Sequence, residues 1–167
     1  MKLFRHLTAL FCLASGTVFA CDKPENRQFD FWIGEWQVTA NGKTAGTNVI
    51  SKHLGECALH EHYTTPTGYE GTSFNIYDKI TRRWHQTWVD NTGLLLQLNG
   101  GLETLEDGRQ AMVMWGEGMN PQGATVTHRI TWTANEDGTV RQHWQMTEDQ
   151  GLTWNSVFDG LYSKKAQ

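Results

Sequence analysis

Apolar and polar residues alternate with a period of two along most of the chain after residue 33, where helical periodicity is nearly absent. Such alternation is typical of strands that bury one face. Turn-forming pairs such as Asn41-Gly42, Asp107-Gly108 and Asp137-Gly138 separate the runs, as short hairpin connections require. The pattern predicts ten strands, at residues 35–41, 45–54, 57–65, 70–78, 83–90, 94–103, 109–117, 124–134, 139–148 and 154–163.

The loops between these runs are mostly short, which favours antiparallel strands that pair in sequence order. About ten strands in such a meander are expected to close on themselves, because closure removes both exposed edges of the sheet. We therefore predict an all-β fold, an antiparallel meander β-barrel of about ten strands.

Residues 22–33 stand outside the strand pattern and directly precede the first strand. Pro24 suits the first turn of a short helical segment. The aromatic side chains that follow it, Phe29, Phe31 and Trp32, are placed to pack against one opening of the barrel. We expect a short N-terminal helical plug that closes this end.

The first 20 residues resemble a secretory signal. Lys2 and Arg5 give a basic start, an apolar stretch follows, and residues 18–20 place small side chains where a signal peptidase cleaves. We predict a signal peptide at 1–20 and a single barrel domain at 21–167. The protein is then expected to be periplasmic or secreted.

The net charge of the chain limits the kinds of binding partner that are expected. The leader holds two of the 14 basic residues and none of the 18 acidic residues, so without it the formal net charge moves from −4 to −6. An acidic chain without a basic cluster is not expected to bind nucleic acid or an anionic membrane surface. Apart from the leader, no apolar run approaches the ~20 residues of a membrane-spanning helix.

Two cysteines remain after the leader, Cys21 and Cys57. In an oxidising compartment they are placed to form a disulfide between the mature N-terminus and the second or third strand. The alternative is a lipid anchor on Cys21, although Phe19 is a poor residue two positions before an acylated cysteine. The two fates exclude each other, because an acylated sulfur cannot form a disulfide.

Alternation also sorts side chains by the face of the sheet on which they lie. The face with the larger apolar residues is expected to point inward. This predicts an inner wall made of Leu59, Glu61, Tyr63, Phe74, Ile76, Trp84, Gln86, Trp88, Val126, His128, Ile130, Trp132, Val140, Gln142, Trp144 and Met146.

A few polar residues interrupt these apolar faces, and buried polar groups need hydrogen-bond partners. An aromatic wall with a few polar groups is typical of a site that orients a small, mostly apolar or amphipathic ligand. The predicted ligand contacts are Tyr63, Trp84, Gln86, Trp88, His128, Trp132, Gln142 and Trp144, with Glu61 as a further polar group.

Two other functions fit the same residues. Glu61 and His128 are candidate catalytic residues, because burial moves the pKa of both groups towards neutrality and an acid–base pair suits an isomerase, dehydratase or hydrolase. In the third interpretation the polar residues satisfy one another inside a filled barrel, and the protein is a structural or interaction module.

The sequence predicts neither a metal site nor a cofactor site. His60 and His62 share a strand face, and His85 and His143 lie on outward faces of later strands, so a surface cluster is the better interpretation. Haem at His128 is disfavoured, because this residue lies mid-strand among bulky side chains. No serine-protease order, phosphate-binding loop or zinc signature is present in the sequence.

The segment Phe29-Asp30-Phe31-Trp32-Ile33-Gly34-Glu35-Trp36 resembles the signature of a family of bacterial secreted domains, the domain of unknown function 1579. Further similarity lies at Gly55-Glu56-Cys57-Ala58-Leu59 and Trp84-His85-Gln86-Thr87-Trp88-Val89-Asp90. The resemblance covers most of the mature chain. It implies a calycin-like barrel, loosely similar to lipocalins, and it supports a Cys21–Cys57 disulfide. It implies no activity.

Overall fold

The computed structural model describes residues 21–120 and 122–165, and the leader predicted at residues 1–20 lies outside them. The described chain forms two short 3₁₀ segments followed by ten β-strands. The segments are η1 (Pro24–Arg27) and η2 (Asp30–Trp32), and the strands are β1 (Gly34–Ala40), β2 (Lys43–His53), β3 (Ala58–Thr64), β4 (Glu70–Asp78), β5 (Arg83–Asp90), β6 (Leu95–Thr104), β7 (Gln110–Met119), β8 (Thr125–Ala134), β9 (Val140–Thr147) and β10 (Asn155–Lys164).

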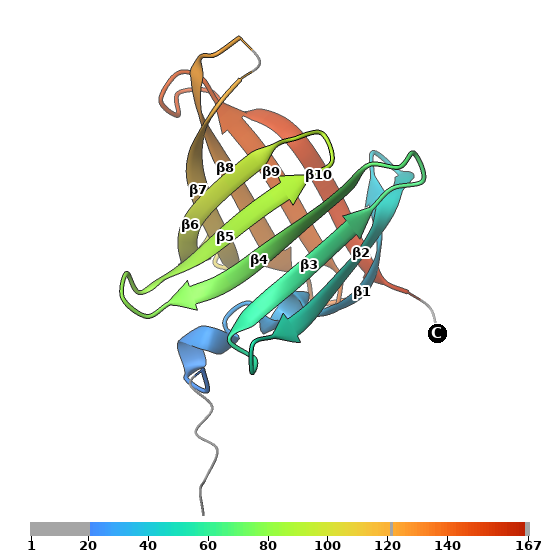
Figure 1. The fold of residues 1–167 in the computed structure, drawn as a ribbon, viewed down its shortest axis with the longest axis vertical. Helices are drawn as coiled ribbons and strands as arrows, with labels where there is room; N and C mark the ends of the chain where they lie inside the picture. Colours follow the sequence, from blue (N-terminus) through green and yellow to red (C-terminus); the bar gives the residue numbers. More distant parts are fainter. Residues whose placement is uncertain (1–20, 121, 166–167) are drawn as a thin grey trace, which may run out of the picture.

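Each strand pairs antiparallel with its neighbours in sequence, and β10 pairs with β1 to close the barrel (Figure 1). The predicted meander barrel is confirmed, and every predicted strand boundary lies within two residues of the observed one. The closing pair joins the first and the last strand in one wall, with Val38 opposite Tyr162. Closure of this kind removes the sheet edges that an open meander would expose.

The hairpin between β1 and β2 shows how local sequence produces this topology. Asn41 and Gly42 both have positive φ, 51° and 72°. This is the geometry of the tight two-residue turn whose twist matches that of the flanking strands, and asparagine and glycine adopt it at low cost. The turn sets Ala40 opposite Lys43 and so starts the β1–β2 register.

The N-terminal segment packs into one end of the barrel, as predicted (Figure 1). Phe29 and Trp32 are fully buried, and their rings stack with centroids 4.9 Å apart. Phe29 also meets the rings of Trp84 and Trp132 edge-on, at 5.7 and 5.2 Å. Burying each of these side chains contributes roughly 2–3 kcal/mol. The plug and the strand ends around it therefore form the floor of the barrel.

The chain leaves the plug through Gly34, whose φ of +144° is rarely adopted by residues with a side chain. Two side chains hold this exit. The Trp36 indole N–H donates to the Trp32 carbonyl at 2.8 Å. The Lys164 ammonium lies 3.8 Å from the Trp36 ring centroid and donates to the Ile33 carbonyl at 2.7 Å.

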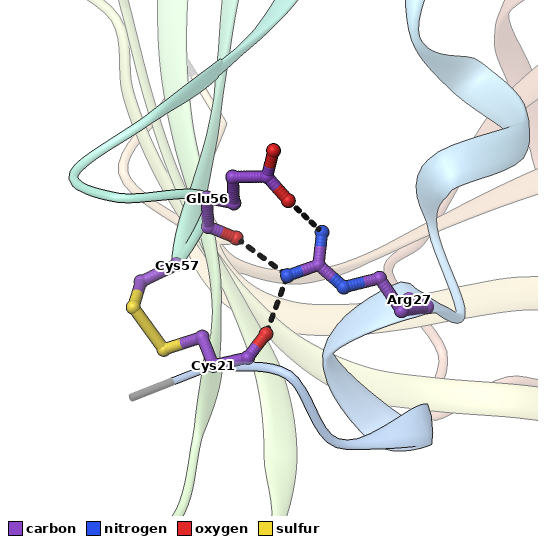
Figure 2. The surroundings of a disulfide bond; sticks show 4 residues. All are labelled: Cys21, Arg27, Glu56 and Cys57. Carbon is purple, nitrogen blue, oxygen red and sulfur yellow. Dashed lines mark hydrogen bonds and ion pairs between the residues drawn. A yellow bond between two sulfur atoms is a disulfide. The ribbon is translucent and has the colours of Figure 1, made fainter. Parts of the chain in front are cut away.

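A disulfide joins Cys21 to Cys57, with Cα atoms 5.0 Å apart (Figure 2). The predicted pairing is present, and it uses the Cys21 sulfur that a lipid anchor would require. Arg27 reinforces the junction, because its guanidinium donates to the carbonyl oxygens of Cys21 and Glu56 and to the Glu56 carboxylate at 3.1 Å. The start of the plug is thereby tied to the β2–β3 turn.

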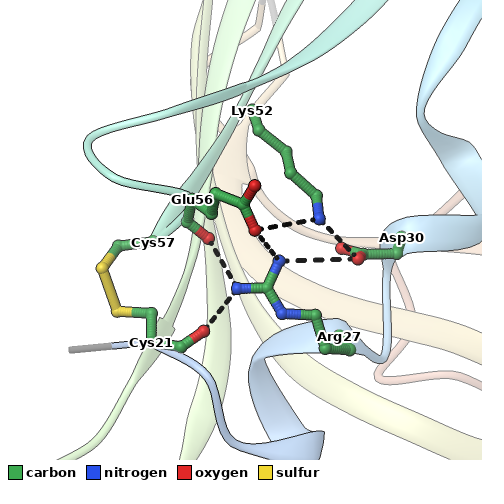
Figure 3. Close-up of polar contacts among 6 residues, drawn as sticks. All are labelled: Cys21, Arg27, Asp30, Lys52, Glu56 and Cys57. Carbon is green, nitrogen blue, oxygen red and sulfur yellow. Dashed lines mark hydrogen bonds and ion pairs between the residues drawn. A yellow bond between two sulfur atoms is a disulfide. The ribbon is translucent and has the colours of Figure 1, made fainter. Parts of the chain in front are cut away.

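An ionic cluster extends this attachment to β2 (Figure 3). Lys52 lies 3.0 Å from the Asp30 carboxylate and 3.3 Å from that of Glu56, and Arg27 reaches Asp30 at 3.6 Å. These side chains are 28–56% exposed, so each pair is worth at most about 1 kcal/mol. The disulfide and the buried aromatics therefore carry most of the attachment.

The inward face is confirmed for β3, β5 and β8, where the predicted residues are buried except for the half-buried Trp88. The prediction for β4 is wrong. Phe74 and Ile76 are 49% and 36% exposed, whereas Ser73 and Asn75 are buried. The β3–β4 register sets Ser73 opposite Glu61. A buried carboxylate needs hydrogen-bond donors. This register supplies Ser73 as a donor and leaves Phe74 and Ile76 on the outer face, where they are not buried.

Candidate functional site

The interior is divided into the packed floor and a cavity of about 320 Å³, a volume at the lower end of small-molecule sites. The cavity reaches the barrel end opposite the plug, because Thr65 and Tyr69 of the β3–β4 hairpin are among its walls. It is lined by Glu61, Tyr63, Thr65, Tyr69, Gln86, Trp88, Leu96, Ile130, Gln142, Trp144, Val157, Phe158 and Tyr162.

Six of the predicted site residues meet around this cavity: Glu61, Tyr63, Gln86, Trp88, Gln142 and Trp144. Trp84 and Trp132 do not line it. Both pack on Phe29 in the floor, where their exposed fractions are 1% and 0%. They share the inner face with the lining residues but lie at the other end of the barrel.

His128 also lies away from the cavity walls. Its Nδ1 accepts a hydrogen bond from the Trp144 indole at 3.1 Å, and burial lowers the pKa of its imidazole. β8 and β3 are separated by five strand steps in either direction around the barrel, so His128 and Glu61 stand on opposite walls. The expected acid–base pair between them is therefore not formed.

Glu61 is instead the acceptor of a buried hydrogen-bond network. Its Oε1 accepts from Asn48 Nδ2 at 2.7 Å, and its Oε2 accepts from Ser73 Oγ at 2.6 Å. Behind Ser73, Asn75 Nδ2 donates to Ser73 Oγ at 2.9 Å, and Gln86 Nε2 donates to Asn75 Oδ1 at 2.8 Å. The network thus runs along the inner wall from β5 to β2.

The network continues through β10 to β9. The Tyr162 hydroxyl accepts from Asn48 Nδ2 at 3.5 Å and donates to Gln142 Oε1. Tyr162 is 2% exposed, and burial together with the Glu61 charge raises the pKa of its phenol well above the usual value. The polar belt below the cavity therefore draws side chains from six of the ten strands.

Burial dominates the protonation of Glu61. Although hydrogen bonds from Ser73 and Asn48 act in the opposite direction, desolvation raises the pKa of this carboxyl from 4.5 to about 7. Burial raises the pKa of the Tyr63 phenol, and the negative charge of Glu61 raises it further. Glu61 therefore exchanges its proton near neutral pH, inside the wall of a cavity that reaches the surface.

A second carboxylate, that of Asp90, lies behind the cavity wall formed by Tyr69 and Trp88. Asp90 Oδ2 accepts from the Tyr69 hydroxyl at 2.8 Å and from the Trp88 indole at 3.4 Å. Burial alone raises the pKa of Asp90, but hydrogen bonds from Thr92 and Tyr69 bring it down to about 2. Asp90 is thus an anion at neutral pH, and it fixes two aromatic walls of the cavity.

Sequence reasoning missed several residues of the site. Asn48 and Tyr162 lie on β2 and β10, whose inner faces were not assigned, although both follow a period of two with buried neighbours. Tyr69 directly precedes β4, and Phe158 lies at a register shift in β10, where alternation is interrupted. Ser73 was hidden by the inverted assignment of β4.

The histidines on the outer face of the barrel each contact a different polar neighbour. His60 Nε2 lies 2.8 Å from Thr72 Oγ1, His62 Nε2 lies 2.6 Å from the Glu70 carboxylate, and His143 Nε2 lies 3.1 Å from Ser156 Oγ. Within residues 21–120 and 122–165, no three His, Cys, Asp or Glu side chains are arranged to hold a metal ion.

A wider depression of about 770 Å³ lies outside β6–β8, around Arg83, Glu103 and Glu117. Its lining is largely solvent-exposed charged side chains and glycines, so it is a bend in the outer sheet surface. The inner cavity is the better candidate site, because aromatic walls surround a buried polar group there.

In the described part of the chain, no helix has the length and apolar character needed to cross a membrane. The ten-strand meander barrel is consistent with a calycin-like fold. Comparison with models of known protein families and with curated proteins gave no match.

Proposed function

We propose that the protein binds a small, mostly apolar molecule in the interior of its barrel. One observation carries this proposal: a cavity of about 320 Å³ with aromatic walls is also lined by Glu61, an acidic residue that is only 3% exposed. A barrel that serves only as a structural module has no need of such a space, because filling it with side chains would add packing energy.

The proposal also covers the compartment in which the protein works and the family to which it is related. The Cys21–Cys57 disulfide is compatible with an extracytoplasmic compartment, since such bonds persist where the medium is oxidising. Together with the signal-like leader it supports a periplasmic or secreted binding protein, with one barrel domain at 21–167. The Phe29–Trp36 signature supports kinship with the domain of unknown function 1579.

Native mass spectrometry of protein purified from its own compartment tests the proposal, together with tryptophan fluorescence titration of a panel of small lipophiles. We expect a co-purifying molecule or saturable quenching. Trp144→Leu, which removes a cavity wall, is expected to weaken binding at least about fivefold. Trp115→Leu is the matched control, because Trp115 packs against Arg129 on the outer surface.

A different set of results would refute interior binding. If nothing co-purifies, no lipophile quenches, and both tryptophan variants behave alike, the interior is not a binding site. The filled-barrel interpretation, a structural or interaction module, then replaces it.

A further inference from the structure

We propose that the molecule bound in the cavity is an organic cation, with a protonated amine or quaternary ammonium group on a small apolar body. This inference rests on the proposed interior binding and adds the charge of the ligand. It combines three features: the charges that line the cavity, the direction of the buried hydrogen bonds, and the aromatic walls.

The first feature is the charge balance of the cavity. In the described part of the chain, the lining contains one carboxylate, Glu61, and no lysine, arginine or histidine. His128 lies outside the lining, and its Nδ1 accepts a hydrogen bond from the Trp144 indole. Behind the cavity wall, Asp90 adds a second negative charge that does not itself line the cavity. A bound anion would meet the Glu61 carboxylate with no counter-charge in the lining, whereas a cation would be attracted by Glu61 and, at longer range, by Asp90.

The second feature is that two lines of hydrogen-bond donors, one from Gln86 and one from Asn48, end at Glu61. Gln86 donates to Asn75, Asn75 to Ser73, and Ser73 to Glu61 Oε2. Asn48 donates to Glu61 Oε1 from the other side. Such a chain of donors stabilises the carboxylate form of Glu61, because both of its oxygens accept hydrogen bonds.

The direction of this chain is set by the backbone. Asn75 Nδ2 also lies 3.4 Å from the Leu59 carbonyl oxygen, which can only accept. The amino end of the Asn75 amide must therefore face Leu59 and Ser73, and its oxygen must face Gln86. Ser73 Oγ, having accepted from Asn75, directs its own hydrogen to Glu61.

The anion held in this way lacks a counter-charge. Glu61 is 3% exposed, and no cationic side chain contacts it within the described residues. A buried charge without a partner is costly, and hydrogen bonds offset only part of that cost. A bound cation supplies the missing partner.

The third feature is the wall above Glu61. Five aromatic side chains line the cavity besides Tyr162: Tyr63, Tyr69, Trp88, Trp144 and Phe158. The faces of such rings attract a cation, and aromatic cages are the usual sites for quaternary ammonium groups. The same rings bury the apolar body of the ligand.

Protonation of Glu61 then controls binding. The titratable groups that face it are phenols, Tyr63 on β3 and Tyr162 on β10, whose pKa values are raised, so both are neutral at physiological pH. β2, β4, β5 and β9 present only the uncharged groups Asn48, Ser73, Asn75, Gln86 and Gln142. Glu61 is thus the group in the lining whose charge changes between pH 5 and 9.

Isothermal titration calorimetry with three probes of similar size tests the inference: 2-phenylethylammonium, the neutral 2-phenylethanol and the anion phenylacetate. At about pH 8.5 the cation is expected to bind at least about tenfold more tightly than the alcohol, and phenylacetate most weakly. At about pH 5.5 the cation's affinity is expected to fall at least about tenfold, towards that for the alcohol, because a carboxyl with a pKa of about 7 is then mostly protonated. The affinity for the alcohol is expected to change little.

Glu61→Gln removes the charge and keeps the shape of the side chain. It is expected to lower the affinity for the cation to that for 2-phenylethanol, while binding of the alcohol shows that the cavity is intact. Wild-type protein provides a measurement that needs no variant. Near pH 7, titration in two buffers of different ionisation enthalpy is expected to show proton release with the cation and none with the alcohol.

The outcomes separate the two proposals. If the alcohol or phenylacetate binds as tightly as the cation at about pH 8.5, or if the cation releases no proton, the cation inference is overturned and interior binding stands. If none of the three probes binds and nothing co-purifies, interior binding fails and the cation inference fails with it.

Discussion

Removing the Cys21–Cys57 disulfide is expected to destabilise the barrel without unfolding it. The perturbation is Cys21→Ser with Cys57→Ser, or reduction of the wild-type protein. The bond closes a loop with a sequence separation of 36 residues. In the chain-entropy treatment, a loop of this length lowers the free energy of unfolding by about 4 kcal/mol when it is opened.

The barrel should survive this loss, because the plug keeps its other contacts. Phe29 and Trp32 remain fully buried, and Arg27 still bridges the plug to the β2–β3 turn. At roughly 2–4 °C per kcal/mol for a chain of this size, the loss lowers the midpoint of thermal unfolding by about 10 °C.

Urea unfolding followed by tryptophan fluorescence measures the effect. The two single variants, the double variant and reduced wild-type protein are expected to give the same free energy of unfolding, since each opens the same loop. A decrease below about 1 kcal/mol in all four would refute the reasoning. It would show that the unfolded chain already holds these segments together, so that closing the loop costs little entropy.

Three further predictions concern the interior. Because the pKa of Glu61 is raised in the folded protein, the free energy of unfolding should decrease as the pH rises from about 4.5 to 7, by an amount on the order of 3 kcal/mol. The difference in unfolding free energy between wild type and Glu61→Gln should follow this decrease, and a difference that does not depend on pH would contradict it. Phe29→Ala should cost roughly 3–5 kcal/mol in the floor, whereas Phe74→Ala, at a site 49% exposed, should cost less than half as much in the same urea assay; equal costs would contradict the assigned plug. Gly71→Ala places a methyl group against the Trp88 ring, so it should shift the tryptophan emission and weaken ligand binding; unchanged emission and affinity would show that the wall yields freely.

Much of the fold was predictable from the sequence because its signals are local. Alternation with a period of two marks each strand, and turn pairs such as Asn41-Gly42 mark where the chain reverses. Short connections then leave a sequential meander as the simplest pairing, and closure follows from the number of strands. The aromatic plug was likewise predictable, because a cluster of large apolar side chains must be buried.

The site was less predictable because period-two alternation gives the face of a residue but not its height in the barrel. Trp84 and Trp88 share one face of β5, yet Trp84 lies in the floor and Trp88 in the cavity wall. Only the position of the plug separates them. Nor does alternation tell which wall a strand occupies, and that decided the separation of Glu61 from His128.

The sequence by itself determined the barrel, its strands and the aromatic segment that closes one end, since these depend on local periodicity and on the need to bury apolar surface. The tertiary structure alone decided the surroundings of Glu61. Its partners Asn48 and Ser73 come from neighbouring strands through their register, and the inward turn of Ser73 reverses what hydrophobicity along β4 indicates. A buried carboxylate outweighs two exposed apolar side chains, because an unsatisfied charge costs more than lost apolar burial.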